Sequence, residues 1–340
     1  MWDEMGKSPA IVQPSDFWCL LNDRNTRQLG DEGFAHFKRT VNHNYFSWIP
    51  HRLRDDQLRT MVKAWLLHPE LAVVSARLGD TSTVEAGAAR ANPFVGSRSR
   101  YIHGVFIALL WEYVRRMDAR GILTRLEEPD VGDPVVATYR GRRISADLGN
   151  SVFDFYSATA ALPDFQPGPG GVLELGGGYG RVAWVFLKEV PAARYILCDI
   201  PPALAIAQEY LTTLFPDRRT FRFRHFDSHA AVADELEAAQ LVFLTPNQLS
   251  LLEPLGLSLF LNISSLHEMR PEQIDHYLKE ADRHTEGFFY TKQWRTWYNP
   301  DDHVVINQDG YPIPATWRRL WERAHPIQRR FFHALYDTRG

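Results

Sequence analysis

Cysteine is scarce in this chain of 340 residues. The two cysteines, Cys19 and Cys198, do not have the spacing of zinc ligands, and Cys198 lies within an apolar run. We expect both thiols to be reduced and structural, as is usual in the cytoplasm. Long apolar runs are lacking too, because the longest, Val105–Leu110, falls far short of the roughly 18 residues that cross a bilayer. The sequence therefore predicts no membrane partner, and the acidic start at Asp3 and Glu4 predicts no signal peptide.

An excess of basic charge is also absent. The 38 Lys and Arg residues are outnumbered by 41 Asp and Glu residues, which gives a formal net charge of −3. A protein that binds nucleic acid usually has an excess of positive charge to attract the phosphate backbone, so we expect no nucleic-acid partner. The chain does have a 45% share of apolar residues and ten tryptophans, which is typical of a folded protein. Its length predicts two domains, or one large domain with an elaborate cap.

The first 160 residues have mainly helical periodicity. One apolar stripe recurs over 58–66 at the i, i+3, i+4 and i+7 spacing of a helix, and a longer one runs over 102–117. A short hairpin is expected over 138–144 around Gly141. We interpret residues 1–160 as a helical cap domain that binds the acceptor, and whether it also forms a homodimer is left open. The Pro- and Gly-rich stretch 163–171 marks the break after it.

Short apolar runs alternate with helices after this break, over 161–340. The expected strands are Val172–Leu175, Tyr195–Asp199, Leu241–Thr245, Leu257–Ile263 and Phe288–Lys292. The expected helices between them are Val182–Lys188, Ala203–Phe215 and Glu272–Asp282. This alternation predicts a Rossmann-like α/β domain with a parallel sheet covered on both faces. Ligands of such sheets bind beyond the carboxyl ends of the strands, where the strand order reverses.

The first of these strands enters a glycine-rich turn of the form E-x-G-x-G-x-G, from Glu174 to Gly180. Glycines allow a positive φ and a close approach of the backbone to a ligand. A dinucleotide site needs G-x-G-x-x-G, but its last glycine would fall at Arg181. A pyrophosphate also disfavours a neighbouring carboxylate, whereas a cofactor with ammonium and sulfonium groups favours one. Glu174 is therefore predicted to anchor the methionyl part of S-adenosylmethionine, directly or indirectly.

Asp199 ends the next expected strand, 23 residues after Gly176. Its two carboxylate oxygens can accept both hydrogens of a ribose diol. The adenine contacts follow either the stretch 221–226, at Asp227, or the strand Leu241–Thr245. We favour the second, which is followed by Pro246, Asn247 and Gln248, because it leaves one short loop before the next strand.

Five segments of this half resemble bacterial sugar O-methyltransferases of the class I fold. They are LELGGGYGR, DIPPALAIAQEYL, FLTPNQL, LFLNISSLHEM and FFYTKQW. Residues 42–48 and the tail from Trp317 to Gln328 also resemble that family, the first of these more loosely. The resemblance implies S-adenosylmethionine as cofactor and a hydroxyl acceptor on a sugar or a glycosylated natural product. The predicted cofactor-binding residues are Glu174, Gly176, Gly178, Tyr179, Gly180, Asp199, Ile200, Pro246, Asn247, Gln248 and Asn262.

The fourth expected strand leads to His267 and Glu268. A histidine of ordinary pKa, about 6.5, is mostly neutral at pH 7 and can accept the hydroxyl proton. The segment also resembles the Leu-His-Asp-Trp element of small-molecule O-methyltransferases, in which the histidine is the base. A structural histidine that caps the following helix is the alternative, and Glu268 is expected to orient the imidazole or to replace it.

Candidate acceptor contacts lie in both halves of the chain. Lys292 and Trp294 are expected to follow the fifth strand and to face the same crevice, while Asn44 and Tyr45 would reach the acceptor from the helical half. No metal site is predicted, because His303 directly follows Asp301 and Asp302, and adjacent residues rarely converge on one ion, so this run is more typical of a surface turn. Three rival functions remain open: C- or N-methylation of a non-sugar metabolite, nicotinamide-dependent oxidoreduction, and non-catalytic cofactor binding.

Overall fold

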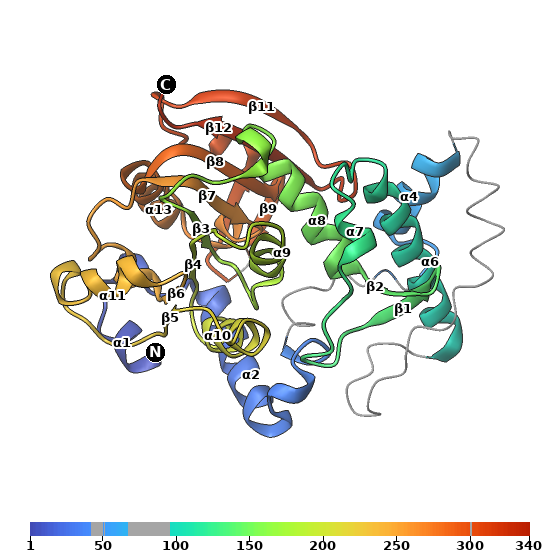
Figure 1. Cartoon of the computed structure of the whole chain (residues 1–340), viewed down its shortest axis with the longest axis horizontal. Helices are drawn as coiled ribbons and strands as arrows, with labels where there is room; N and C mark the ends of the chain where they lie inside the picture. The colour runs from blue at the N-terminus through green and yellow to red at the C-terminus, as the bar shows by residue number, and fades with distance from the viewer. Residues whose placement is uncertain (42–49, 51, 67–95, 300) are drawn as a thin grey trace. The chain divides into compact units, whose positions relative to one another are not determined.

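The computed structural model describes residues 1–41, 50, 52–66, 96–299 and 301–340, which form two compact units (Figure 1). The first unit consists of Met1–Arg24, Ser157–His325 and Arg330–Gly340, and the second of Asn25–Tyr156 and Pro326–Arg329. Across the described ranges, no helix combines the length and apolar character needed to span a membrane.

An eight-stranded sheet forms the centre of the first unit. Its strand order is β11-β12-β8-β7-β3-β4-β6-β5. The strands are β3 (Val172–Leu175), β4 (Tyr195–Cys198), β5 (Thr220–Phe221), β6 (Leu241–Leu244), β7 (Leu257–Ile263), β8 (Thr285–Trp294), β11 (Arg318–Ala324) and β12 (Phe331–Asp337). The pairs from β5 through β8 are parallel, whereas β12 pairs antiparallel with both β8 and β11. The expectation of a Rossmann-like α/β fold is confirmed.

Helices cover both faces of this sheet. From β3 the chain moves outward through α9 (Arg181–Glu189) to β4 and through α10 (Ala203–Leu214) toward β6. It then returns to the other side of β3 and moves in the opposite direction from β7 through α13 (Pro271–His284) to β8. Because parallel crossovers are right-handed, α13 lies on the face opposite to α9 and α10. The strand order thus reverses at β3, which places the expected ligand crevice at the end of this strand.

The shorter elements of the first unit connect or flank these layers. They are α1 (Trp2–Met5), η1 (Ala10–Val12), η3 (Pro163–Phe165), η4 (His229–Ala231), α11 (Ala233–Ala238), α12 (Pro246–Leu249), η5 (Leu266–Glu268), η6 (Gln308–Gly310), and a separate hairpin of β9 (Thr296–Asn299) and β10 (Val304–Asn307). The sequence did not predict strands β9 to β12, nor that residues 1–24 belong to the sheet unit. The assignment of the chain to acceptor-binding and cofactor-binding domains stays a prediction.

The second unit is built around α6 (Gly96–Arg115), which packs against α4 (Asp56–Leu66) and against the hairpin of β1 (Val136–Tyr139) and β2 (Arg142–Ser145). The Trp65 indole donates a hydrogen bond to the Leu109 carbonyl across the helix pair (3.2 Å). Glu112 is buried and accepts a hydrogen bond from the Tyr139 hydroxyl (2.8 Å). The two helices and the hairpin expected here are thus confirmed. The described residues of this unit also form η2 (Phe34–His36) and α7 (Ile122–Arg125). The helices α2 (Asp16–Glu32) and α8 (Ala146–Ala158) belong partly to each unit.

Candidate functional site

The glycine turn after β3 is closely packed at one position and open at another. Gly176, Gly178 and Gly180 all have a positive φ, of 75°, 57° and 86°. A Cβ on Gly176 would lie 2.5 Å from Ser265 Cβ and nearer still to its hydroxyl. A Cβ on Gly178 would meet no atom within 4 Å. The turn therefore packs against the end of β7 through Gly176 and leaves free space at Gly178, where a ligand can approach the backbone.

Asp199 follows β4 and directly contacts this turn. Its Oδ2 accepts the Gly178 amide hydrogen and its Oδ1 accepts the Ile200 amide hydrogen, both at 2.7 Å. The residue is 8% exposed, and burial raises the pKa of the carboxyl to about 7 although the two amides act to lower it. A carboxylate offers about four lone pairs, so two acceptor positions remain for a diol.

Glu174 lies below the turn, away from solvent. It is 2% exposed, and its Oε2 accepts a hydrogen bond from the Tyr195 hydroxyl (2.7 Å). The same oxygen is 3.0 Å from the point at which a Cβ of Gly177 would lie. Of the two predicted roles, this position favours indirect support of the methionyl site. Tyr179 is also buried and packs edge-to-face on Tyr210 (5.3 Å between ring centroids).

The end of β6 adjoins Asp199, since the Asp199 amide donates to the Leu244 carbonyl (3.1 Å). In α12, which begins at Pro246, Gln248 is fully buried and its amide bonds the Thr245 amide and the Arg224 carbonyl. Asn247 is half-buried and donates to Glu4 Oε1 (3.1 Å). Asp227, the alternative adenine contact, is 89% exposed after the edge strand β5. Adjacency thus favours the β6 end for adenine, and Asn247 is its more accessible polar side chain.

His267 is fully buried at the end of β7. The Trp294, Trp297 and Phe331 rings surround its imidazole, with centroid distances of 6.1, 5.5 and 6.0 Å. Nδ1 is 2.9 Å from Gln293 Oε1. Burial lowers the pKa of His267 to about 3, although the hydrogen bond with Gln293 acts to raise it. The imidazole is therefore neutral, and an acceptor can reach it only after a neighbouring side chain moves.

Glu268 is a neighbour of His267 and is influenced by the charge of Asp199. Its Oε1 is 3.6 Å from His267 Nε2, and its side chain retains 16% exposure. Burial, and then the charge of Asp199, raises the pKa of Glu268 well above its usual value. The site therefore combines two carboxyl groups of raised pKa with a histidine of lowered pKa, and perturbed pKa values of this kind are common where proton transfer occurs.

Lys292 and Trp294 were expected to follow the fifth strand, and the structure places both of them within it. Strand β8 extends to Trp294, so Lys292 lies within it rather than after it. Successive side chains leave a strand on opposite faces. Gln293 bonds His267, so Lys292 and Trp294 leave the strand on the face opposite to Gln293. Lys292 is 2% exposed, and its charge adds to the effect of burial in lowering the pKa of His325. The predicted acceptor contacts Asn44 and Tyr45 lie outside the described residues.

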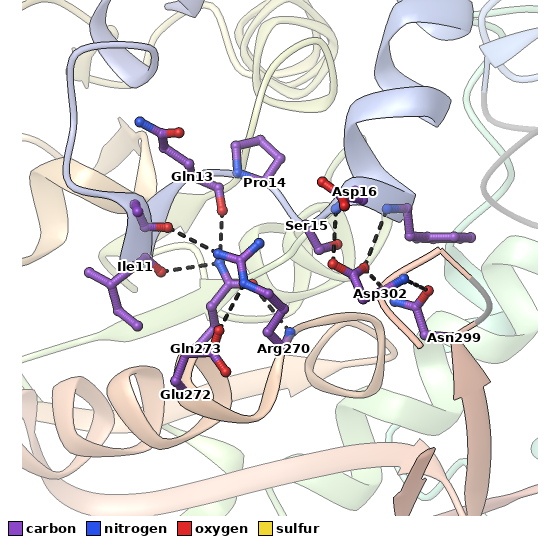
Figure 2. Close-up of polar contacts among 12 residues, drawn as sticks. Ile11, Gln13, Pro14, Ser15, Asp16, Arg270, Glu272, Gln273, Asn299 and Asp302 are labelled. Atoms are coloured by element: carbon purple, nitrogen blue, oxygen red, sulfur yellow. Dashed lines mark hydrogen bonds and ion pairs between the residues drawn. The ribbon is translucent and has the colours of Figure 1, made fainter. Parts of the chain in front are cut away.

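The N-terminal segment lies along the carboxyl ends of the strands, which the sequence did not indicate. Figure 2 shows its main-chain carbonyls facing Arg270 and Gln273 at the start of α13. Gln273 Nε2 donates to the carbonyls of Ile11 (3.1 Å) and Gln13 (2.8 Å), and the Ser15 hydroxyl donates to the Glu268 carbonyl (3.0 Å). Most of these contacts use main-chain atoms, which leave no residue pattern to detect.

The loop that contains His303 holds the other end of this segment. Asp302 accepts hydrogen bonds from the amides of Asp16 (3.1 Å) and Phe17 (3.4 Å) at the start of α2 (Figure 2). Asn299 also donates to the Asp302 carboxylate (2.8 Å). Asp302 is therefore a helix-capping residue.

Comparisons with known proteins show similarity in structure but not in sequence. No family model and no curated protein matches the sequence. Solved structures that resemble the chain include the pyocyanin biosynthetic protein PhzM (12% identity, 84% of this chain and 74% of that chain, TM-score 0.36). Another is the magnesium protoporphyrin IX methyltransferase of Synechocystis with bound SAH (10% identity, 55% of this chain and 80% of that chain, TM-score 0.37). A third is an S-adenosylmethionine-dependent methyltransferase of Clostridium acetobutylicum (10% identity, 50% of this chain and 84% of that chain, TM-score 0.34). The function of this chain therefore has to follow from its own site residues.

Proposed function

We propose that this chain is an S-adenosylmethionine-dependent methyltransferase that methylates a hydroxyl group. One observation carries the proposal: the free space at Gly178 lies at the reversal of strand order, and Asp199 contacts the same glycine. Gly176, Gly178, Asp199 and Ile200 would hold the cofactor, with Asn247 at its adenine end. The cofactor supplies a methyl group on a positively charged sulfur.

The residues of the turn fit this cofactor better than a dinucleotide. Asp199 already accepts the Gly178 amide hydrogen, so this amide is not available to a phosphate. Glu174 adds a second carboxyl below the turn. Two acidic groups disfavour a pyrophosphate and favour a ligand with ammonium and sulfonium groups. This argument disfavours the oxidoreductase alternative.

His267 is the proposed base for the acceptor hydroxyl. Burial keeps the imidazole unprotonated throughout the neutral range, so its lone pair is available to the hydroxyl proton, although a pKa of about 3 makes it a weak base. Glu268 is the alternative base, because it is closer to solvent. The half-buried Trp294 and Trp297 beside them suit the apolar face of a sugar ring. We therefore infer a sugar or a glycosylated natural product as acceptor.

Two measurements test this function. Calorimetry should show binding of S-adenosylmethionine and none of a nicotinamide dinucleotide. Mass spectrometry of candidate glycosides should then show a gain of one methylene, with the free aglycones unchanged. Binding without transfer to any hydroxyl, amine or carbon acceptor would favour the non-catalytic alternative, and dinucleotide binding would refute the proposal.

The choice of base can be made from the pH dependence of kcat/KM at saturating cofactor. With His267 as base, the rate should be level between about pH 5 and pH 8, because its pKa of about 3 lies below this range. With Glu268 as base, the rate should rise with pH through the raised pKa of its carboxyl. His267→Gln should lower kcat at least tenfold without changing cofactor affinity, whereas a fully active His267→Gln variant removes the imidazole from the chemistry.

A further inference from the structure

Two backbone groups fix the orientation of the Asn262 amide at the end of β7. Asn262 is fully buried, and its Nδ2 is 3.0 Å from the Leu175 carbonyl, which can only accept. Its Oδ1 is 3.2 Å from the Leu266 amide, which can only donate. Leu175 immediately precedes Gly176, so this side chain connects the glycine turn to the end of β7.

The orientation of Gln293 follows in the same way. Its Oε1 is 3.3 Å from the His267 amide, which donates. Its Nε2 is 3.2 Å from the Asn262 carbonyl and 2.6 Å from Asn262 Oδ1, and both of these atoms accept. Nε2 also donates to Thr291 Oγ1 (2.9 Å). A flipped Gln293 amide would place a donor against a donor and an acceptor against an acceptor, at high cost in a buried site.

These orientations determine which ring nitrogen of His267 carries the hydrogen. Because Gln293 Oε1 can only accept, the ring nitrogen 2.9 Å away must carry a hydrogen. A neutral imidazole has one ring hydrogen, so Nε2 is left with a free lone pair. We propose that Gln293 is a positioning residue that fixes His267 as the Nδ1–H tautomer and leaves Nε2 as the proton acceptor of the site.

The surroundings of Nε2 are consistent with this role. No described residue makes a hydrogen bond to Nε2, and the nearest ionisable group is Glu268, at 3.6 Å. The aromatic rings of Trp294, Trp297 and Phe331 beside the imidazole carry no charge. The Arg330 guanidinium lies 5.6 Å from the centroid of the Trp294 ring. Nε2 therefore keeps a lone pair that can accept a hydrogen from a ligand once a neighbouring side chain moves.

The tautomer follows from hydrogen bonds alone, whereas its use as a base depends on the proposed function. The chain of contacts from Leu175 through Asn262 and Gln293 to His267 joins the predicted cofactor turn to the predicted base. Rigid support of this kind holds a proton acceptor in one orientation without touching the substrate.

Nitrogen NMR of the ligand-free protein, with ¹⁵N in its histidine rings, tests the tautomer directly. The signals of His267 are identified by their loss in His267→Gln. We expect a protonated Nδ1 and an unprotonated Nε2 that stay unchanged between about pH 5 and pH 8. A hydrogen on Nε2 alone, or titration near the ordinary pKa of about 6.5, would overturn the proposal.

Two substitutions separate positioning from packing. In Gln293→Met the acceptor is lost, so a population with hydrogen on Nε2 should appear. In Gln293→Glu an oxygen again faces Nδ1, and the hydrogen should stay there. Gln240→Glu, at an exposed position, is the control and should leave the signals of His267 unchanged. Retention of Nδ1–H as the sole form in a folded Gln293→Met variant contradicts the proposal. If Gln293→Met does not fold, the wild-type spectrum still decides.

The two proposals fail in different ways. A wild-type spectrum with Nδ1–H, together with no methyl transfer to any acceptor, supports the positioning role and refutes the function. Detected methyl transfer with hydrogen on Nε2 supports the function and refutes the positioning role.

Discussion

Replacing Asp199 by asparagine should weaken binding of S-adenosylmethionine by more than tenfold, or over about 1.4 kcal/mol. Both oxygens of Asp199 accept backbone amides at 2.7 Å, from Gly178 and Ile200. An asparagine side chain must present its NH₂ group to one of these two donors, and it also offers fewer lone pairs to a ribose diol. Calorimetric titration measures the loss. Asp217→Asn, at an exposed position, is the matched control and should bind normally.

The affinity for the cofactor should also depend on pH in the wild type. Burial raises the pKa of Asp199 to about 7, and a diol donates hydrogens to the ionised form. Affinity should therefore fall as pH decreases below 7, up to roughly tenfold per pH unit, and level off above it. Titration in two buffers of different ionisation enthalpy should reveal release of a proton on binding at about pH 6. A pH-independent affinity, or the same slope in Asp199→Asn, would contradict this assignment.

Sequence pattern predicted the parallel part of the sheet well, for a physical reason. Strands buried on both faces are continuous apolar runs, so Val172–Leu175 and Leu257–Ile263 were predicted with their observed bounds. Strand β8 was expected over Phe288–Lys292 and is five residues longer. The antiparallel strands β11 and β12 were missed. In β11 no residue is fully buried, and exposed residues flank a half-buried centre, as at an exposed sheet edge, which resembles a polar loop.

The site could be predicted only where a local motif fixes it. The glycine turn and Asp199 end adjacent parallel strands, so their spacing implies proximity. Phe331 reaches His267 through pairing of β12 with β8, a non-local contact without any local signal. Ile11 and Gln13 likewise contact Gln273, at the start of α13, through their carbonyl oxygens. Burial of His267 could not be inferred either, since it results from rings on three strands.

Two alanine substitutions in the glycine turn should differ sharply in their effects. In Gly176→Ala, a positive φ of 75° is combined with overlap of the new Cβ with Ser265. We expect a loss of about 2–4 kcal/mol in the free energy of unfolding, measured with urea, because strain and overpacking add. In Gly178→Ala, the φ of 57° costs only about 1–2 kcal/mol, because the new methyl meets no atom within 4 Å.

For cofactor affinity, Gly178→Ala should have a strong effect although its effect on stability is the smaller of the two. The methyl in Gly178→Ala enters the space assigned to the cofactor, so affinity should fall at least tenfold while the protein stays folded. Gly141→Ala is a matched control, because Gly141 has a φ of 74° and no atom within 4 Å of its Cβ position but lies in the β1–β2 turn. It should lose similar stability and bind the cofactor normally. If Gly178→Ala bound S-adenosylmethionine as well as Gly141→Ala does, the free space at Gly178 would not be the cofactor site, and the proposed function would lose the observation on which it rests.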